Sequence, residues 1–231
     1  MTALFLSRAR LKPDQATTAL LPILAPQGRL TSHVGKALMW SLFADRDDRK
    51  RDFLWRWDGE RPGRLAGEFL ILSGRPPVNS GLFELETRDF APALSVGDRL
   101  AFKLRANPVI RRRVDGRPRT TKHDVVMHGL RDRLKGERAA PRQALLAEAG
   151  LAWMGRQLAE AGADLVADSL RVDGYQQHRI SDGRGREIAL SSLDFDGALL
   201  VTDPDRLLSR LASGFGSGRA YGFGLMLIRR A

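Results

Sequence analysis

Residues Arg99–Pro108, with the sequence RLAFKLRANP, show the clearest strand pattern in this chain. Leu100, Phe102 and Leu104 alternate with small or charged residues, and this period of two places them on one face of a β-strand. The strand is expected to end at Pro108, because proline has no backbone N–H to donate to a neighbouring strand. A strand with one buried face needs partners, and the patterns on either side of it indicate what they are.

The residues before this strand predict an α+β unit. Their patterns are a strand at 3–9, a helix at 32–44 with its N-cap at Ser32, strands at 52–57 and 67–74, and a weak element at 82–86. With 99–108 as the last strand, the order is strand, helix, strand, strand, weak element, strand. This is the order of the ferredoxin-like βαββαβ fold.

The residues after Pro108 repeat the same plan with a different sequence. They predict helices at 122–134, 141–161 and 204–214, and strands at 169–180, 188–203 and 225–230. The missing first strand is expected near the arginine-rich segment 109–124, which holds an Asp-Gly turn signal. The predicted fold class is therefore α+β, with two tandem ferredoxin-like (RRM-like, βαββαβ) domains at residues 1–110 and 111–231.

The charge of the chain favours a polyanionic partner. The 231 residues carry a formal net charge of +11 with a pI of about 11.0, and six of the 38 basic residues are lysine while the others are arginine. Arginine suits bidentate contacts to phosphate and stacking on bases. Nucleic acid is the first partner class that this balance predicts. An acidic protein partner and a GC-rich coding bias are the alternative explanations.

The composition excludes several classes of protein. Cysteine is absent, which removes disulfides, thiol nucleophiles and cysteine metal ligands and fits a cytoplasmic location. The four histidines are scattered without metal-ligand spacing, so no metal site is expected. No run of about 18 apolar residues occurs, so no membrane partner is predicted. The N-terminal apolar run precedes its charges, and we interpret it as a strand rather than a signal peptide.

A glycine-rich stretch, GFGSGRAYGFG at 214–224, is a candidate for phosphate contact. Gly214, Gly216 and Gly218 alternate with other residues, and glycine lets backbone N–H groups approach a phosphate closely. Arg219 adds a positive charge. The stretch follows a helix, precedes a strand and lacks the lysine of a Walker loop, so no nucleotide cofactor is predicted. The structural alternative is a helix C-cap that leads into a bulged strand.

Five stretches, taken in order, resemble one known family. They are LFLSRARL at 4–11, LMWSLFADRDDRKRDFLWR at 38–56, FKLRANPVIRR at 102–112, LDFDGALLVTDPDRLL at 193–208 and GFGSGRAYGFGLMLI at 214–228. With these, the chain resembles the CasE family, the CRISPR repeat-processing endoribonucleases of type I-E Cascade. The match runs over nearly the whole chain. WSLFADRDDRKRDFLW together with KLRANP is specific, whereas a glycine-rich loop alone is not.

The resemblance implies an RNA endonuclease that uses no metal and no other cofactor. Members of this family bind the hairpin of the CRISPR repeat RNA and cut the pre-crRNA once, at the 3′ base of the stem. The 2′-hydroxyl next to the cut attacks its own phosphate and leaves a 2′,3′-cyclic phosphate. The protein then stays on the crRNA and joins other Cascade subunits, notably the backbone subunit. Such a reaction needs a base, an acid and positive charge on the phosphate.

The resemblance also implies where the chemistry lies. The family's first helix carries Tyr-x-x-His, and counting back from WSLF places these positions at His33 and Lys36. In one interpretation His33 is the acid or base and Lys36 neutralises the phosphate. In a second, Lys36 is catalytic and His33 orients the RNA. In a third, the replacement leaves a cleavage-defective RNA-binding Cascade subunit of the same fold. Without the resemblance, two polar residues on a helix face are more often structural.

The predicted RNA contacts come from the arginine-rich segment and the glycine-rich stretch. They are Arg111, Arg112, Arg113, Arg117, Arg119, Lys122, Gly214, Gly216, Gly218 and Arg219. An A-form stem hides its base edges in a deep, narrow major groove, so phosphate and shape contacts are expected to dominate. The alternative for 111–119 is a solvated loop. An RNA-recognition-motif protein with another target is a further hypothesis, and the lack of an RNP1-like strand counts against it.

Overall fold

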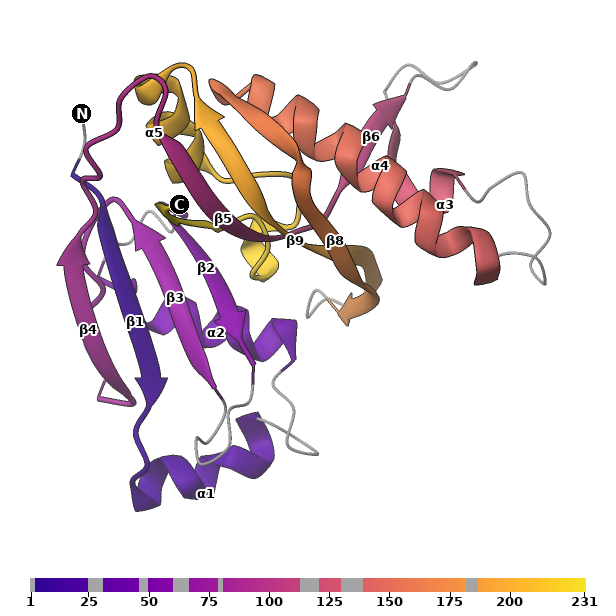
Figure 1. The fold of residues 1–231 in the computed structure, drawn as a ribbon. Coiled ribbons are helices and arrows are strands. Elements are labelled where there is room, and N and C mark those ends of the chain that lie inside the picture. Colours follow the sequence, from indigo (N-terminus) through magenta and orange to yellow (C-terminus); the bar gives the residue numbers. More distant parts are fainter. Residues whose placement is uncertain are drawn as a thin grey trace.

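The computed structural model describes residues 3–24, 31–45, 50–59, 67–78, 81–112, 121–129, 139–181 and 187–231. Within these residues the protein is α+β with antiparallel sheets, as the sequence predicted (Figure 1). The elements are β1 (Phe5–Leu11), α1 (Gln15–Leu24), α2 (Ser32–Ser41), β2 (Phe53–Asp58), β3 (Glu68–Ser73), β4 (Phe83–Asp89), β5 (Arg99–Ala106), β6 (Val109–Arg112), β7 (Thr121–Asp124), α3 (Val125–Gly129), α4 (Ala139–Ala159), β8 (Ala163–Ser181), β9 (Glu187–Val201), α5 (Pro204–Ser213), the 3₁₀ turn η3 (Arg219–Tyr221) and β10 (Met226–Arg230).

The first sheet has the strand order β2-β3-β1-β4, and its neighbouring strands are antiparallel. Helix α2 covers one face, and its buried Leu38 and Met39 enter a core with Phe53 and Phe69. Phe43, just after α2, stacks on Phe53 with 4.3 Å between the ring centroids. Aromatic contacts of this kind add to the burial of apolar area. They fix the end of α2 over β2.

The second sheet has the order β10-β5-β9-β8. Helices α4 and α5 supply the apolar side chains that cover it, including the fully buried Leu158, Leu207 and Leu211. Trp153 of α4 stacks on Phe195 of β9 with 5.2 Å between the ring centroids. Strands β6 and β7 form a separate two-stranded sheet beside α4 (Figure 1).

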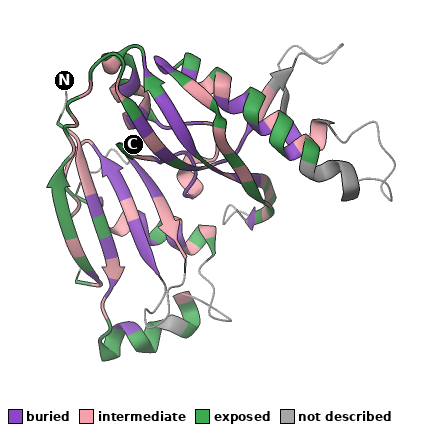
Figure 2. Cartoon of the chain, viewed as in Figure 1, coloured by how far each residue is buried: buried purple, intermediate pink, exposed green. Residues whose placement is uncertain are grey.

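The first sheet also contacts the second unit directly. Leu54 of β2 and Leu72 of β3 form a buried cluster with Leu225, which directly precedes β10. Figure 2 shows buried residues along β2 and β3, whereas the outer strand β4 is largely exposed. Among these buried contact residues, the first sheet contributes side chains of β2 and β3 and none of its edge strand β4.

The strand predicted at Arg99–Pro108 exists, but its expected place in the fold is wrong. Leu100, Phe102 and Leu104 of β5 face the core, as the alternation predicted. However, β5 pairs with β9 and β10 in the second sheet. Alternation shows that one face of a strand is buried, but it does not say against which sheet. The weak element predicted at 82–86 supplies the missing strand, because β4 pairs with β1.

Three smaller expectations also change. Helix α1 is an element that the sequence patterns did not include. The N-cap of α2 is Thr31 rather than Ser32, because the backbone N–H of Val34 donates to the Thr31 hydroxyl at 3.3 Å. The expected helix at 122–134 begins as strand β7, and only α3 is helical within the described part of that segment.

The division into domains at residue 110 stays a prediction. Strand β5, which that division assigned to the first domain, is paired within the second sheet. The membership of the sheets therefore favours a division within 90–98, between β4 and β5.

Candidate active site between the two sheets

A cavity of about 470 Å³ lies where α2 and the first sheet meet the second sheet. One wall is formed by the first turn of α2 together with β2 and β3. The other is formed by β5, β8, β9 and the end of the glycine-rich stretch. The lining contains aromatic rings, hydroxyls, an imidazole and a guanidinium, so it offers both stacking surfaces and proton-exchanging groups.

Trp55 of β2 joins the two walls. A Cβ atom on Gly35 of α2 would lie 2.8 Å from the Trp55 ring, and one on Gly222 would lie 2.9 Å from the same ring. The indole N–H of Trp55 donates to the backbone oxygen of Ala220 at 3.3 Å. Only glycine leaves room for the indole at both positions. The start of α2 is thus seated against the glycine-rich stretch through one buried tryptophan.

The structure places the two predicted catalytic residues differently with respect to this cavity. The ammonium of Lys36 lies over the ring of Tyr221, 5.3 Å from its centroid, and Tyr221 lines the cavity. The side chain of His33 is exposed one turn earlier on α2 and does not line the cavity. Lys36 therefore reaches the rim of the cavity through Tyr221, whereas His33 lies outside its lining.

Arg105 of β5 provides a fixed positive charge in the opposite wall. Its guanidinium donates two hydrogen bonds to the carboxylate of Asp194, at 2.7 and 2.8 Å. This bond to Asp194 raises the pKa of Arg105, against the opposing effect of burial. A guanidinium held in this bidentate geometry has a defined direction. It can face an incoming phosphate while Asp194 holds it in place.

His178 of β8 lies beside Arg105 in the same wall. Its Nε2 and the hydroxyl of Ser192 share a hydrogen bond of 2.8 Å, and its ring lies 5.3 Å from that of Phe223. Burial lowers the pKa of His178, and the nearby charge of Arg105 lowers it further. Both effects favour the neutral imidazole.

The glycine-rich stretch packs closely against the protein around it. Gly214 follows α5 with a φ of 82° and its N–H bonds to Arg210, so the expected helix C-cap is confirmed. A Cβ on Gly216 would lie 2.8 Å from the backbone oxygen of Asn107, and one on Gly218 would lie 3.0 Å from Phe223. Arg219 donates to the backbone oxygen of Ser213. Positive φ and close approach explain these glycines, and their RNA contacts stay a prediction.

The arginine-rich prediction falls largely outside the described residues. Arg113, Arg117 and Arg119 are not among them. Arg111 and Arg112 belong to β6, and Lys122 belongs to β7, with Arg111 paired to Lys122 across the two strands. The structure therefore places the backbone of these three residues on the small sheet, and their RNA contacts stay a prediction.

Sequence reasoning did not select Arg105, His178 or Tyr221. Arg105 lies inside KLRANP and Tyr221 lies inside the glycine-rich stretch, so both motifs contained a usable signal. His178 had no signal beyond being a histidine. Its position in the cavity depends on the pairing of β8 with β9 and on the contact between the two sheets, and no local pattern reports either.

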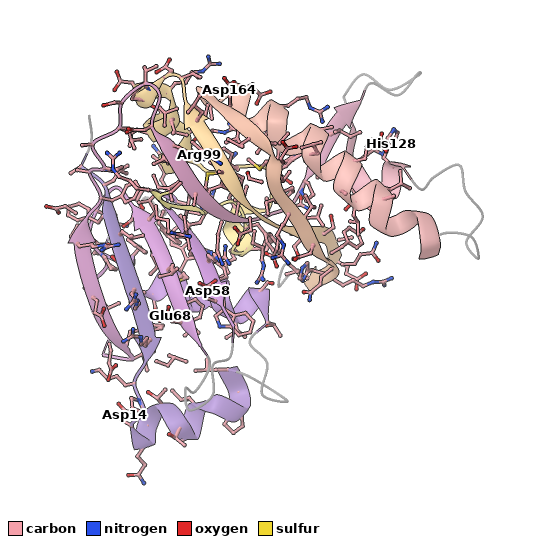
Figure 3. The ribbon with its side chains drawn as sticks, in the orientation of Figure 1. Asp14, Asp58, Glu68, Arg99, His128 and Asp164 are labelled. Carbon is pink, nitrogen blue, oxygen red and sulfur yellow. The ribbon has the colours of Figure 1, made fainter. Side chains whose placement is uncertain are left out.

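Figure 3 shows the side chains on both sheets, with Asp58 and Glu68 at the paired ends of β2 and β3. In the part of the chain that the structure describes, no cluster of three or more histidine, cysteine or acidic residues has the geometry to hold a metal ion. Within the same residues, no helix is long and apolar enough to cross a membrane.

Comparisons with known proteins agree over most of the chain. The sequence model of the family described as CRISPR associated protein matches residues 4–230. The chain is 29% identical over 190 residues to the CRISPR system Cascade subunit CasE of Escherichia coli (strain K12), covering 81% of this chain and 86% of that protein. It is 31% identical over 150 residues to the CRISPR-associated endoribonuclease Cse3 of Thermus thermophilus, covering 61% of this chain and 60% of that protein.

Solved structures show the same likeness. The fold is similar to a structure of CRISPR endoribonuclease Cse3 bound to 19 nt RNA, with a TM-score of 0.69, 22% identity and coverage of 98% of this chain and 99% of that one. It is also similar to the CRISPR-associated protein Cas6e from Escherichia coli str. K-12, with a TM-score of 0.57, 20% identity and coverage of 98% and 100%. At these identities the structural likeness shows a shared fold.

Proposed function

The chain belongs to the CRISPR associated protein family, which includes the CasE proteins, and on this premise we propose that it is a CRISPR repeat-processing endoribonuclease. It binds the hairpin of the repeat RNA and cuts pre-crRNA at the 3′ base of the stem without a metal ion. It then keeps the crRNA as a Cascade subunit in the cytoplasm, next to the backbone subunit. The observation that carries the proposal is the cavity, because it brings proton-exchanging groups and cations together between α2 and the second sheet.

The repeated architecture supports two tandem ferredoxin-like units. Both four-stranded sheets have the same strand order. When the strands of each sheet are numbered as they occur along the chain, the fourth lies next to the first, the first next to the third, and the third next to the second. The second unit has the full element order βαββαβ once β6, β7 and α3 are treated as an insertion. In the first unit, the described residues between β3 and β4 contain no helix.

The proposed reaction is an internal transfer at one phosphate. The 2′-oxygen loses its proton and forms a bond to the adjacent phosphorus, while the bond from phosphorus to the 5′-oxygen breaks. The departing 5′-oxygen takes a proton from the protein. Lys36 stabilises the charge that develops on the phosphate, and His33 on the same helix face exchanges a proton. The position of Lys36 over Tyr221 at the cavity supports its role.

Cleavage is expected to continue in excess EDTA. The full chain is incubated with a repeat-hairpin RNA under single-turnover conditions, with and without the chelator. One cut, with equal rates in both and a 2′,3′-cyclic phosphate on the 5′ product, supports the enzyme. A cut that EDTA abolishes contradicts the metal-independent mechanism. Tight binding without any cut supports the alternative, a cleavage-defective RNA-binding Cascade subunit of the same fold.

The arginine-rich segment is expected to contribute to the salt dependence of RNA binding. Each phosphate contact releases condensed counterions, so the slope of log affinity against log salt concentration changes by about one per contact. Replacing Arg111, Arg112 and Arg113 with alanine is expected to weaken binding and to flatten that slope. The measurement is RNA affinity from low to moderate salt, for the variant and the wild type. An unaltered slope would place the binding surface elsewhere.

A further inference from the structure

We propose that His178 is a catalytic residue of this endoribonuclease and accepts the proton of the attacking 2′-hydroxyl. The inference rests on the proposed function and adds a group from the second sheet to the residues on α2. It assigns the proton acceptor to the wall that faces α2, so that the scissile phosphate lies between the two sheets.

The position of His178 carries this assignment. It is the one histidine that lines the cavity among the described residues, and the other lining groups include Ser32 of α2 and Tyr221 of η3. His33 is exposed on α2, while His123 and His128 lie together on β7 and α3 with 5.8 Å between their rings. His178 is therefore the imidazole that a nucleotide entering the cavity meets.

The contacts of His178 hold the ring and leave one nitrogen for substrate. Its Nε2 is engaged with the hydroxyl of Ser192 at 2.8 Å, which fixes the orientation of the ring. No hydrogen bond from the described residues engages Nδ1. Because serine can donate or accept, the Ser192 hydroxyl can follow the change of protonation at the ring. A general base needs this combination of a fixed ring and a free nitrogen.

The charges around His178 favour the unprotonated ring. The groups that face it are Arg105 from β5, Ser192 from β9 and the uncharged ring of Phe223. The carboxylate of Asp194 is held by two hydrogen bonds from Arg105, so its charge is already paired. Partial burial and a neighbouring guanidinium both disfavour an imidazolium. The ring is therefore ready to accept a proton.

The step balances with the groups already described. The O2′–H bond breaks and its proton moves to Nδ1 of His178, while O2′ forms a bond to phosphorus. The bond between phosphorus and O5′ breaks, and O5′ takes a proton from His33 on α2. Lys36, on the α2 side, and Arg105, on the β5 side, both stabilise the negative charge that develops on the phosphate. The products are a 2′,3′-cyclic phosphate and a 5′-hydroxyl, with no oxidant, reductant or metal needed.

The test compares single-turnover cleavage of a repeat-hairpin RNA by the full chain and three variants. His178→Gln keeps a side chain that can hydrogen-bond to Ser192 but cannot accept a proton, and His178→Ala removes the side chain. Gln177→Ala is the matched control, because Gln177 is the exposed neighbour of His178 on β8. Both His178 variants are expected to cut at least about 100-fold more slowly, with unchanged RNA affinity, and the control at the wild-type rate. Added imidazole is expected to restore part of the rate of His178→Ala.

A second substrate separates the two directions of proton transfer. In an RNA whose scissile 5′-oxygen is replaced by sulfur, the leaving group no longer needs a proton. His178→Gln is expected to stay slow on this RNA, as the loss of a base requires. Recovery of the wild-type rate would make His178 the acid and overturn the assignment.

The outcomes distinguish this inference from the proposed function. If the wild type cuts and both His178 variants cut at the same rate, the role of His178 is refuted and the function stands. If the wild type binds the RNA but does not cut it, both are refuted. If His178→Ala unfolds, His178→Gln decides the question.

Discussion

Replacing His33 or Lys36 with alanine is expected to slow single-turnover cleavage of the repeat RNA at least about 100-fold, which corresponds to about 2.7 kcal/mol of lost transition-state stabilisation. The two losses have different causes. Without His33 the departing 5′-oxygen lacks a proton donor, and without Lys36 the phosphate charge loses a cation that lies over Tyr221 at the cavity. The measurement is the first-order cleavage rate at saturating protein, with RNA affinity determined in parallel.

Conservative variants separate the interpretations of this pair. Lys36→Arg keeps the positive charge, and a rate near that of the wild type means that Lys36 acts through charge. A rate as low as that of Lys36→Ala means that Lys36 itself exchanges a proton. Full activity of His33→Ala would discard His33 as a catalytic group and leave α2 with one catalytic residue. A wild type that does not cut would support the cleavage-defective interpretation.

Replacing Gly222 with alanine is expected to lower the free energy of unfolding by about 3 kcal/mol. Gly222 has a φ of 87°, where an L-residue is strained, and its added Cβ would lie 2.9 to 3.2 Å from three atoms of the Trp55 ring. The indole cannot easily move away, because it is buried and its N–H is hydrogen-bonded to the backbone oxygen of Ala220. The backbone strain and the clash with Trp55 therefore both destabilise the contact that holds the start of α2 against the glycine-rich stretch.

Gly97→Ala is the matched control for this substitution. Gly97 has a φ of 89°, but a Cβ there would meet no atom within 4 Å. The Gly97→Ala variant has the backbone strain without a steric clash, so its free energy of unfolding is expected to fall by about 1 kcal/mol. Urea unfolding of both variants gives the difference, which measures the contact with Trp55. Equal losses of unfolding free energy in the two variants would show that the indole moves aside and that its contact does not hold α2 in place.

Local patterns predicted much of the fold because they report burial. The alternation of Leu100, Phe102 and Leu104 identified β5, and a proline followed ten residues later by a glycine bounded α5 closely. What the patterns could not report is pairing between distant segments. Strand β5 was therefore expected in the wrong sheet, and the weakly alternating β4 was not expected to be the partner of β1. Register and neighbours depend on long-range contacts, which one-dimensional periodicity does not contain.

The site was predictable only where a motif carried it. His33 and Lys36 came from counting along the segment that carries the family resemblance, and their roles stay proposals. Arg105 and His178 lie 73 positions apart in the chain and meet because β5 and β8 both pair with β9. Arginine and histidine also occur on exposed surfaces that have no function, so residue type alone could not select these two.

The packing of Trp55 between Gly35 and Gly222 predicts how the residues at these positions vary among related proteins. Three positions from α2, β2 and the glycine-rich stretch share one volume, so a change at one alters what the others tolerate. A smaller residue at position 55 is expected to permit a side chain at position 35, whereas a tryptophan there is expected to accompany glycine at both 35 and 222. Independent variation at these three positions would contradict this coupling. We therefore expect the residues of this contact to change together in evolution, although they lie far apart in the chain.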